Sequence, residues 1–171
     1  MDLVGLLVDT VADARAAGPD HDWQLDLAVL EPPADATPEE AEDFLPEPPL
    51  VIGDEARLRQ VVVNLLANAR VHTPAGSHVT TTLAREGDTL IVRIHDDGPG
   101  IAPDVRNRLF ERFARGDSSR ERRTGSTGLG MSIALAIVQS HGGSTDVDSS
   151  TTPEDHGTTF SVRLPAAAVE E

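Results

Sequence analysis

The 171-residue sequence contains no cysteine and no lysine, and aromatic side chains make up only 3% of it. The lack of cysteine excludes disulfides, thiolate metal sites and a cysteine nucleophile. The lack of lysine excludes the Gly-x-x-x-x-Gly-Lys-[Ser/Thr] loop that binds phosphate in many proteins. No apolar run approaches the ~20 residues that span a bilayer, and no signal peptide is visible. We therefore expect a soluble, cytoplasmic domain without direct membrane contact, whose core is built from Leu, Val, Ile and Ala.

Charge is unevenly spread along the chain, whose formal net charge is −15. Residues 31–49 hold seven acids, six prolines and no base, which is typical of a solvated loop. Residues 106–123 hold seven of the 14 basic residues, all arginine. Because the overall charge repels nucleic-acid phosphates, we expect no nucleic-acid partner. Binding of a local anion, such as a nucleotide phosphate, stays open.

Hydrophobic periodicity and turn residues predict the order of the elements. Helices are expected at 3–16, from an N-cap at Asp54 to about Thr73, from Pro103, and at 129–141. Strands are expected at 23–29 and 50–52, in a hairpin over 79–96 that turns at 86–88, and in two short segments after Gly143. The strands are grouped in pairs, which favours an α+β sandwich over a doubly wound parallel sheet.

Polar residues break three otherwise apolar faces. Asn64 and Asn68 lie one turn apart at the edge of the apolar stripe of the long predicted helix. Alternation places Asp96 on the same face as Leu90, Val92 and Ile94, and a buried carboxylate needs partners. Thr158 similarly ends an apolar row in the last strand. Asp96 could still be a turn acid and Thr158 a backbone partner, but together these residues indicate a pocket.

Glycines flank these positions. Gly98 and Gly100 follow Asp96 directly and are expected to leave room for a ligand beside it. Gly125, Gly128 and Gly130 precede or open the last helix, whose N-terminal amides favour an anion. The segment before them is polar rather than a strand, so this is not a dinucleotide-binding fingerprint.

Five motifs in order, "NLLANARVHTP", "DDGPGI", "LFERFAR", "GSTGLGMSI" and "GTTF", resemble the ATP-binding catalytic domain of sensor histidine kinases. These kinases share a superfamily with gyrase, Hsp90 and MutL. The resemblance implies a two-layer α/β sandwich, with a mixed sheet packed on helices and a mobile ATP lid. It covers residues 1–165, with an enlarged acidic loop at 31–49 and a lid at 116–127, and leaves 166–171 as a tail.

The resemblance also implies roles for individual residues. Asp96 would hold the adenine amine, Gly98, Gly100 and Ile101 would shape the adenine pocket, and Thr158 would lie behind it. Asn64 and Asn68 would hold Mg²⁺ and phosphate, so the cofactors expected are ATP and Mg²⁺. The lid end of the site would comprise Gly125, Thr127, Gly128, Leu129 and Gly130, with Phe110 and Phe113 anchoring the lid and Arg115 approaching the γ-phosphate as a catalytic residue.

Asn64 favours a kinase over a hydrolase. In the hydrolysing members of the superfamily, a glutamate stands at this position and activates water. An amide is not a general base at neutral pH, whereas phosphoryl transfer mainly needs positioning and charge neutralisation.

Two positions depart from the family pattern. Val71 stands where a basic residue is common, and His72 stands where tyrosine is usual. Arg70 is expected to lie on another side of the helix, so Arg57, Arg115 or a lid arginine is the candidate for the phosphate contact. His141 is expected to be structural or solvated.

The His-Glu-x-x-[Thr/Asn]-Pro helix that carries the phosphoacceptor histidine in such kinases is not in this sequence. The acceptor would therefore lie on a dimerisation domain of a longer, membrane-anchored and homodimeric parent, of which this chain would be a monomeric fragment. A response regulator would act downstream. Two alternatives stay open, namely a nucleotide-binding regulatory module without transfer and an anti-sigma serine kinase.

Overall fold

The computed structural model describes residues 1–107 and 127–168. Its elements are helices and strands in a mixed order. They are α1 (Leu3–Ala17), β1 (Asp22–Asp26), the 3-10 turn η1 (Ala28–Leu30), α2 (Pro38–Glu42), α3 (Glu55–His72), β2 (His78–Glu86), β3 (Thr89–Asp96), α5 (Thr127–Ser140), β4 (Ser144–Thr152) and β5 (Asp155–Pro165). Residues 103–107 are also helical.

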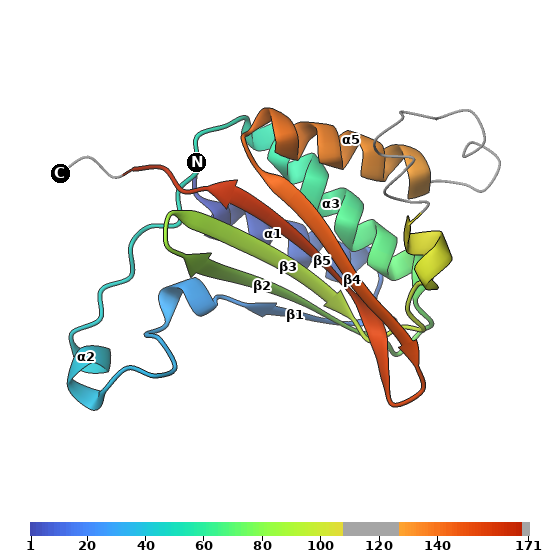
Figure 1. The fold of residues 1–171 in the computed structure, drawn as a ribbon, viewed down its shortest axis with the longest axis horizontal. Coiled ribbons are helices and arrows are strands. Elements are labelled where there is room, and N and C mark those ends of the chain that lie inside the picture. The colour runs from blue at the N-terminus through green and yellow to red at the C-terminus, as the bar shows by residue number, and fades with distance from the viewer. Residues whose placement is uncertain (108–126, 169–171) are drawn as a thin grey trace.

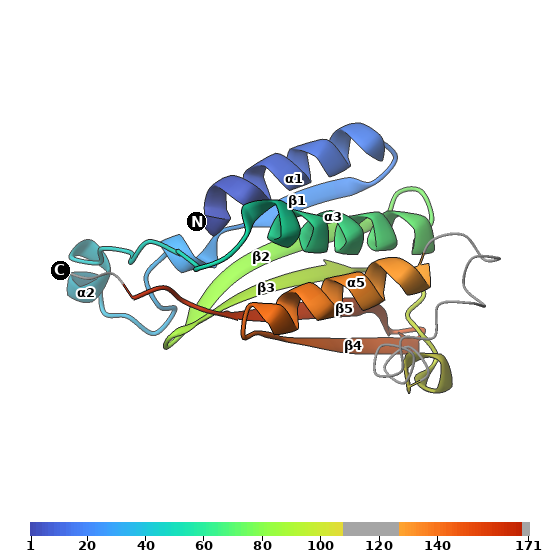
Figure 2. The same cartoon turned by 90° about the horizontal axis from the view of Figure 1, so that it is seen from above.

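The five strands form one mixed sheet in the order β1-β2-β3-β5-β4. β1 runs parallel to β2, and the other neighbouring pairs are antiparallel. Helices α1, α3 and α5 lie side by side in one layer over one face of this sheet (Figures 1 and 2). The two layers confirm the predicted α+β sandwich with a mixed sheet.

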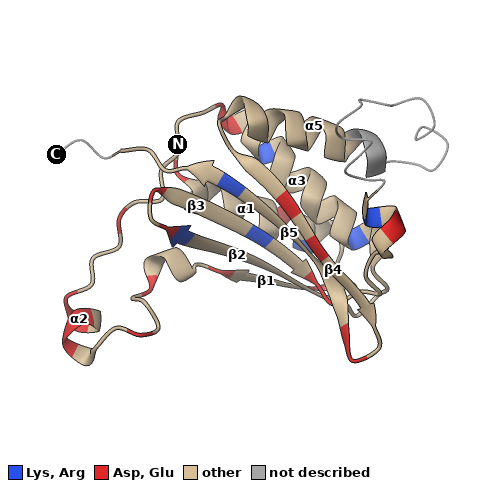
Figure 3. Ribbon diagram, in the orientation of Figure 1, with Lys and Arg blue, Asp and Glu red and all other residues tan. Residues whose placement is uncertain are grey.

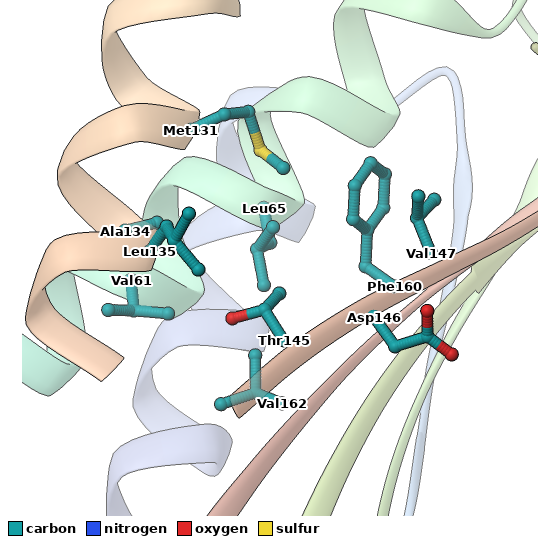
Figure 4. A pocket seen from close by; sticks show the side chains of 10 residues that line it. All are labelled: Val61, Leu65, Met131, Ala134, Leu135, Thr145, Asp146, Val147, Phe160 and Val162. Carbon is teal, nitrogen blue, oxygen red and sulfur yellow. The ribbon is translucent and has the colours of Figure 1, made fainter. Parts of the chain in front are cut away.

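The core lies between the two layers. On α3 the buried stripe is the predicted one, and it comprises Leu58, Val61, Val62, Leu65, Leu66 and Ala69. It faces the apolar rows of β3 and β5, where Leu90, Ile94 and Phe160 are among the buried residues. Figure 4 shows Leu65, Met131 and Phe160 meeting from α3, α5 and β5 around a gap of about 20 Å³. Each fully buried side chain of this size contributes about 1.5–3 kcal/mol of hydrophobic free energy, so these rows fix the helices on the sheet.

The N-terminal end of α3 is fixed by two polar contacts. The Asp54 side chain caps the helix, because its Oδ1 accepts from the Arg57 amide at 3.1 Å. The Asp54 amide donates to Nε2 of His141 at 3.1 Å, and His141 Nδ1 donates to the Ile137 carbonyl at 2.7 Å. His141 therefore joins the end of α5 to the start of α3, which confirms its predicted structural role.

Several boundaries differ from the predicted ones. The strand expected at 23–29 ends at Asp26 and continues as η1, and that expected at 50–52 is reduced to one bridge between Leu50 and Asp2. α5 begins two residues before the expected start, so it includes Thr127 and Gly128. β4 and β5 are long rather than short, at 9 and 11 residues.

The acidic segment 31–49 extends away from the sandwich and carries α2, a five-residue helix (Figures 1 and 3). A capping box between Thr37 and Glu40 closes its first turn. No residue of α2 is buried, and Leu45 is 88% exposed. The segment is thus a solvated loop, as predicted, with one locally stabilised turn of helix. In the described ranges, no helix is long and apolar enough to cross a bilayer.

Candidate functional site

A cavity of about 440 Å³ opens where β3 ends, beside the C-terminal half of α3. It brings together five of the residues predicted for the site, namely Asn68, Asp96, Gly100, Ile101 and Thr158. The rest of its lining is His72, Pro99, Ala102, Val105, Met131 and Phe160. The lining is therefore mostly apolar, with a few convergent polar groups, as in small-molecule sites generally.

Asp96 is the buried acid of this cavity. The alternation of β3 turns it toward the helix layer, where it is 7% exposed, and its Oδ1 accepts from the Gly98 amide at 3.0 Å. Burial raises the pKa of Asp96, against the Gly98 hydrogen bond and the nearby His95 and His72, which act to lower it. A carboxylate accepts about four hydrogen bonds, so this group keeps acceptor capacity for a ligand.

Asp97 points away from the cavity, as the alternation predicts. Its Oδ1 accepts from the His78 amide and its Oδ2 pairs with the His78 ring, both at 2.8 Å. Partial burial acts to raise the pKa of Asp97, but the hydrogen bonds from His78 outweigh it and hold the pKa below its ordinary value. Asp97 is thus occupied by the protein itself.

The two glycines after Asp96 have a different reason from the expected one. Gly98 is buried and does not line the cavity, and a Cβ there would lie 2.5 Å from Thr73 Cγ2. Gly100 has φ 79°, and its Cβ would collide with the Ser150 carbonyl of β4. The glycines let the 97–101 loop pack against the protein's own backbone. Gly100 also lines the cavity, whereas Gly98 shapes it only indirectly.

The two predicted asparagines lie differently. Asn68 lines the cavity, whereas Asn64, one turn earlier, is half-buried and donates from Nδ2 to the Gly130 carbonyl at 3.2 Å. Because a carbonyl only accepts, this bond identifies the amide nitrogen of Asn64 and leaves its Oδ1 as an acceptor. The bond also joins α3 to the first turn of α5.

Amide oxygens of this kind suit Mg²⁺, which is usually held by one or two protein groups, several waters and ligand phosphates. The described residues contain no group of three or more His, Cys, Asp and Glu side chains that could hold a metal. The amide oxygens of Asn64 and Asn68 are the groups of α3 whose chemistry would suit Mg²⁺ beside waters and phosphates.

Sequence reasoning missed two residues that hold the site together. Ser149 of β4 contacts both Thr158 and the Ile101 amide, and His156 donates from Nδ1 to the Gly98 carbonyl at 2.7 Å. Ser149 lies opposite Thr158 in the β4–β5 ladder. Strand register could have identified Ser149, whereas the contact of His156 with the loop carbonyl of Gly98 depends on tertiary packing.

The predicted lid and the residues around it lie mostly outside the part of the chain that the structure describes. Phe110, Phe113, Arg115 and Gly125, with most of the predicted lid at 116–127, lie outside the described residues. Thr127, Gly128 and Leu129 open α5, and Gly130 follows them with its carbonyl bound to Asn64.

Two arginines of α3 do not line the cavity. Arg70 donates from Nη1 to the Ala17 carbonyl at 3.2 Å, on the α1 side of α3, as its helical position predicts. Arg57 pairs with Asp54 at the other end of α3, 11 residues and so about 16 Å from Asn68. The suggestion that Arg57 helps to bind phosphate is therefore wrong.

The chain belongs to the histidine kinase-, DNA gyrase B- and HSP90-like ATPase family, whose model matches residues 53–168. It is 47% identical over 165 residues to the probable sensor histidine kinase TcrY of Mycobacterium tuberculosis, covering 96% of this chain and 30% of that protein. The same organism's sensor histidine kinase TrcS is 39% identical over 170 residues, covering 96% and 29%. The chain is thus similar to the ATP-binding catalytic region of sensor kinases and spans less than a third of their length.

Similar solved structures agree with this family assignment. The mycobacterial sensor histidine kinase MprB superposes with a TM-score of 0.73 at 27% identity, covering 99% of both chains. Full-length ShkA in complex with AMPPNP superposes with a TM-score of 0.67 at 26% identity, covering 99% of this chain and 31% of that one. The fold is therefore that of a histidine kinase ATP-binding domain.

Proposed function

We propose that the cavity binds Mg·ATP and that the domain transfers the γ-phosphate to a histidine on a separate dimerisation and phosphoacceptor domain of a sensor kinase. The observation that carries this proposal is the convergence of Asp96, Asn68 and Thr158 on one cavity. Such a cavity offers an acid for the adenine amine and an amide for Mg²⁺ and phosphate. The crystallised complex of the similar protein ShkA with AMPPNP supports a nucleotide as the ligand.

The proposed roles follow the chemistry of each group. Asp96 accepts a hydrogen bond from the adenine amine, with Thr158 behind it and Gly100 and Ile101 beside the ring. Asn68 and the Oδ1 of Asn64 meet Mg²⁺ and the phosphates, and bound Mg²⁺ neutralises phosphate charge. Asn64 cannot act as a general base for water, so transfer to an acceptor side chain is favoured over hydrolysis.

The remaining roles extend to segments outside the described residues. Arg115 is proposed to approach the γ-phosphate, and residues 116–127 to form a lid over it that Phe110 and Phe113 anchor and that Gly125, Gly128 and Gly130 hinge. Residues 1–165 would form the ATP-binding domain and 166–171 a tail. The names of the relatives support a parent sensor kinase that acts on a response regulator. We place this domain in the cytoplasm, as a monomeric piece of a membrane-anchored, dimeric parent.

Labelling of an added acceptor domain tests the transfer. The chain is mixed with the separately produced dimerisation and phosphoacceptor domain of its parent and with γ-labelled ATP. We expect label on the acceptor histidine, in a linkage that acid hydrolyses. Saturable ATP binding without any label on that histidine would reject the transfer and leave a nucleotide-binding module. Acid-stable label on a serine would instead indicate a serine kinase.

A further inference from the structure

Ser149 is a polar residue of β4 that the proposed roles do not use. Three consecutive strands place a row of polar side chains at the base of the cavity, because Asp96 pairs with Thr158 across β3 and β5, and Thr158 pairs with Ser149 across β5 and β4. Side chains that face each other in such pairs have Cβ atoms about 4.5–5.5 Å apart. Asp96 and Thr158 line the cavity, and Ser149 lies behind Thr158.

The Ser149 hydroxyl makes three hydrogen bonds whose directions can be assigned. Its Oγ lies 3.0 Å from the Gly157 carbonyl, 2.7 Å from the Ile101 amide nitrogen and 2.8 Å from Thr158 Oγ1. The carbonyl can only accept, so it takes the one hydroxyl proton of Ser149. The amide can only donate. With this proton on the Gly157 carbonyl, Ser149 has none left for Thr158, so the arrangement that satisfies all three hydrogen bonds has Thr158 donating to Ser149.

This assignment fixes what Thr158 presents to the cavity. Its single proton is directed at Ser149, so its oxygen faces the cavity as an acceptor only. The Asp96 carboxylate beside it is also an acceptor. Two adjacent acceptors match an exocyclic amine, which carries two protons. The same two acceptors offer no proton to the carbonyl oxygen of a 6-oxo purine. Because a buried polar group without a partner is costly, such a site binds the 6-amino purine more tightly than the 6-oxo purine.

We propose that Ser149 is a positioning residue that sets the base selectivity of the site, because it orients the Thr158 hydroxyl and so excludes 6-oxo purine nucleotides. This inference rests on the proposed binding of ATP with its adenine at Asp96. Removing the Ser149 hydroxyl frees the Thr158 proton to turn into the cavity and to donate to a 6-oxo group. The Ile101 amide also loses its acceptor, which weakens all nucleotides alike.

Calorimetric titration of the chain with ATP and with inosine triphosphate, both with Mg²⁺, tests the inference through the ratio of the two dissociation constants. In Ser149→Ala we expect the preference for ATP to fall about five- to tenfold, the effect of one hydrogen bond. Ser149→Thr, which restores a hydroxyl, should keep the wild-type ratio. Thr159→Val is the matched control, because its hydroxyl bonds His95 at 2.8 Å and its neighbour in sequence is Thr158.

A double variant separates positioning from general packing. In a Thr158→Val background there is no hydroxyl to orient, so adding Ser149→Ala should leave the ratio unchanged. An unchanged ratio in the Ser149→Ala single variant, whether or not both affinities fall together, overturns the inference. Wild-type protein that fails to prefer ATP over inosine triphosphate contradicts instead the adenine assignment on which the inference rests.

Discussion

The two faces of the sheet at the end of β3 carry similar residues that differ in their hydrogen-bond partners. On the outer face, Asp97 is held by the His78 amide and ring, and His95 is held by Thr159. On the inner face, Asp96 accepts a hydrogen bond from the Gly98 amide and borders a cavity of about 440 Å³. The outer acid has its pKa lowered and the inner acid has it raised. Of two adjacent aspartates, one is thus held by hydrogen bonds within the fold and the other borders a cavity.

The largest expected effect separates these two acids in binding. Asp96→Asn should weaken ATP binding by about two orders of magnitude, because a hydrogen bond to a charged group is lost. Asp97→Asn, the matched control on the outer face, should change affinity less than about twofold. Calorimetry measures both. Near-wild-type affinity in the Asp96 variant would contradict the proposal that Asp96 binds the nucleotide.

A smaller effect is expected at Asn68, the residue proposed to meet Mg²⁺ and phosphate. Asn68→Ala should weaken ATP binding about tenfold, roughly 1.4 kcal/mol, in the presence of Mg²⁺. Without Mg²⁺ the difference between the variant and the wild type should shrink, since the contribution of Asn68 as a ligand of the ion is then lost from both. Gln60→Ala, on an exposed position of the same helix, is the control. A loss that persists undiminished in EDTA would argue against a metal ligand.

Ionised Asp96 should also lower the free energy of unfolding when no nucleotide is bound. Because its pKa is raised, the fold favours the protonated form, and ionisation destabilises the fold above the ordinary carboxyl pKa. Asp96→Asn should therefore raise the unfolding temperature at neutral pH by about 2–4 °C, for about 1 kcal/mol. The gain should shrink as the pH falls and vanish below about pH 4. Thermal unfolding over this pH range measures it, and a neutral-pH loss would contradict it.

The outer acid should behave in the opposite sense, and more weakly. The lowered pKa of Asp97 means that its stabilisation is present above the ordinary carboxyl pKa and is lost as pH falls through the folded value. Its side chain is 43% exposed, so solvent screening limits Asp97→Asn to a loss of about 0.5 kcal/mol at neutral pH. Denaturant unfolding at neutral and at low pH checks it. A larger loss of stability in Asp97→Asn at low pH than at neutral pH would contradict the lowered pKa of Asp97.

Sequence patterns predicted the parts of the molecule that depend on local periodicity. The apolar stripe of α3, the inward turn of Asp96 and the outward turn of Asp97 each follow from the spacing of side chains along one element. Asn68 and Thr158 were found in the same way, as polar breaks in apolar rows.

The contacts that sequence could not predict are those between elements. Ser149 meets Thr158 because of the β4–β5 register, and Gly98 and Gly100 are needed because Thr73 and Ser150 lie against them. The expected strand at 50–52 contained a plausible apolar run, but Leu50 found one bridge partner, Asp2, and no neighbouring strand. Such outcomes are set by tertiary packing, which overrides local preference.

Helices α3 and α5 are joined by two hydrogen bonds, one from the middle of α3 and one at its N-terminal end. The Asn64 amide holds the Gly130 carbonyl near the cavity, and the His141 ring holds the Asp54 amide at the far end. Sliding of one helix along the other would break both hydrogen bonds, so they oppose such a displacement together with the apolar contacts between the helices. Three residues before Asp54, the Val51 amide donates to the Met1 carbonyl at 2.9 Å. The segment before α3 is therefore also hydrogen-bonded to the segment that precedes α1.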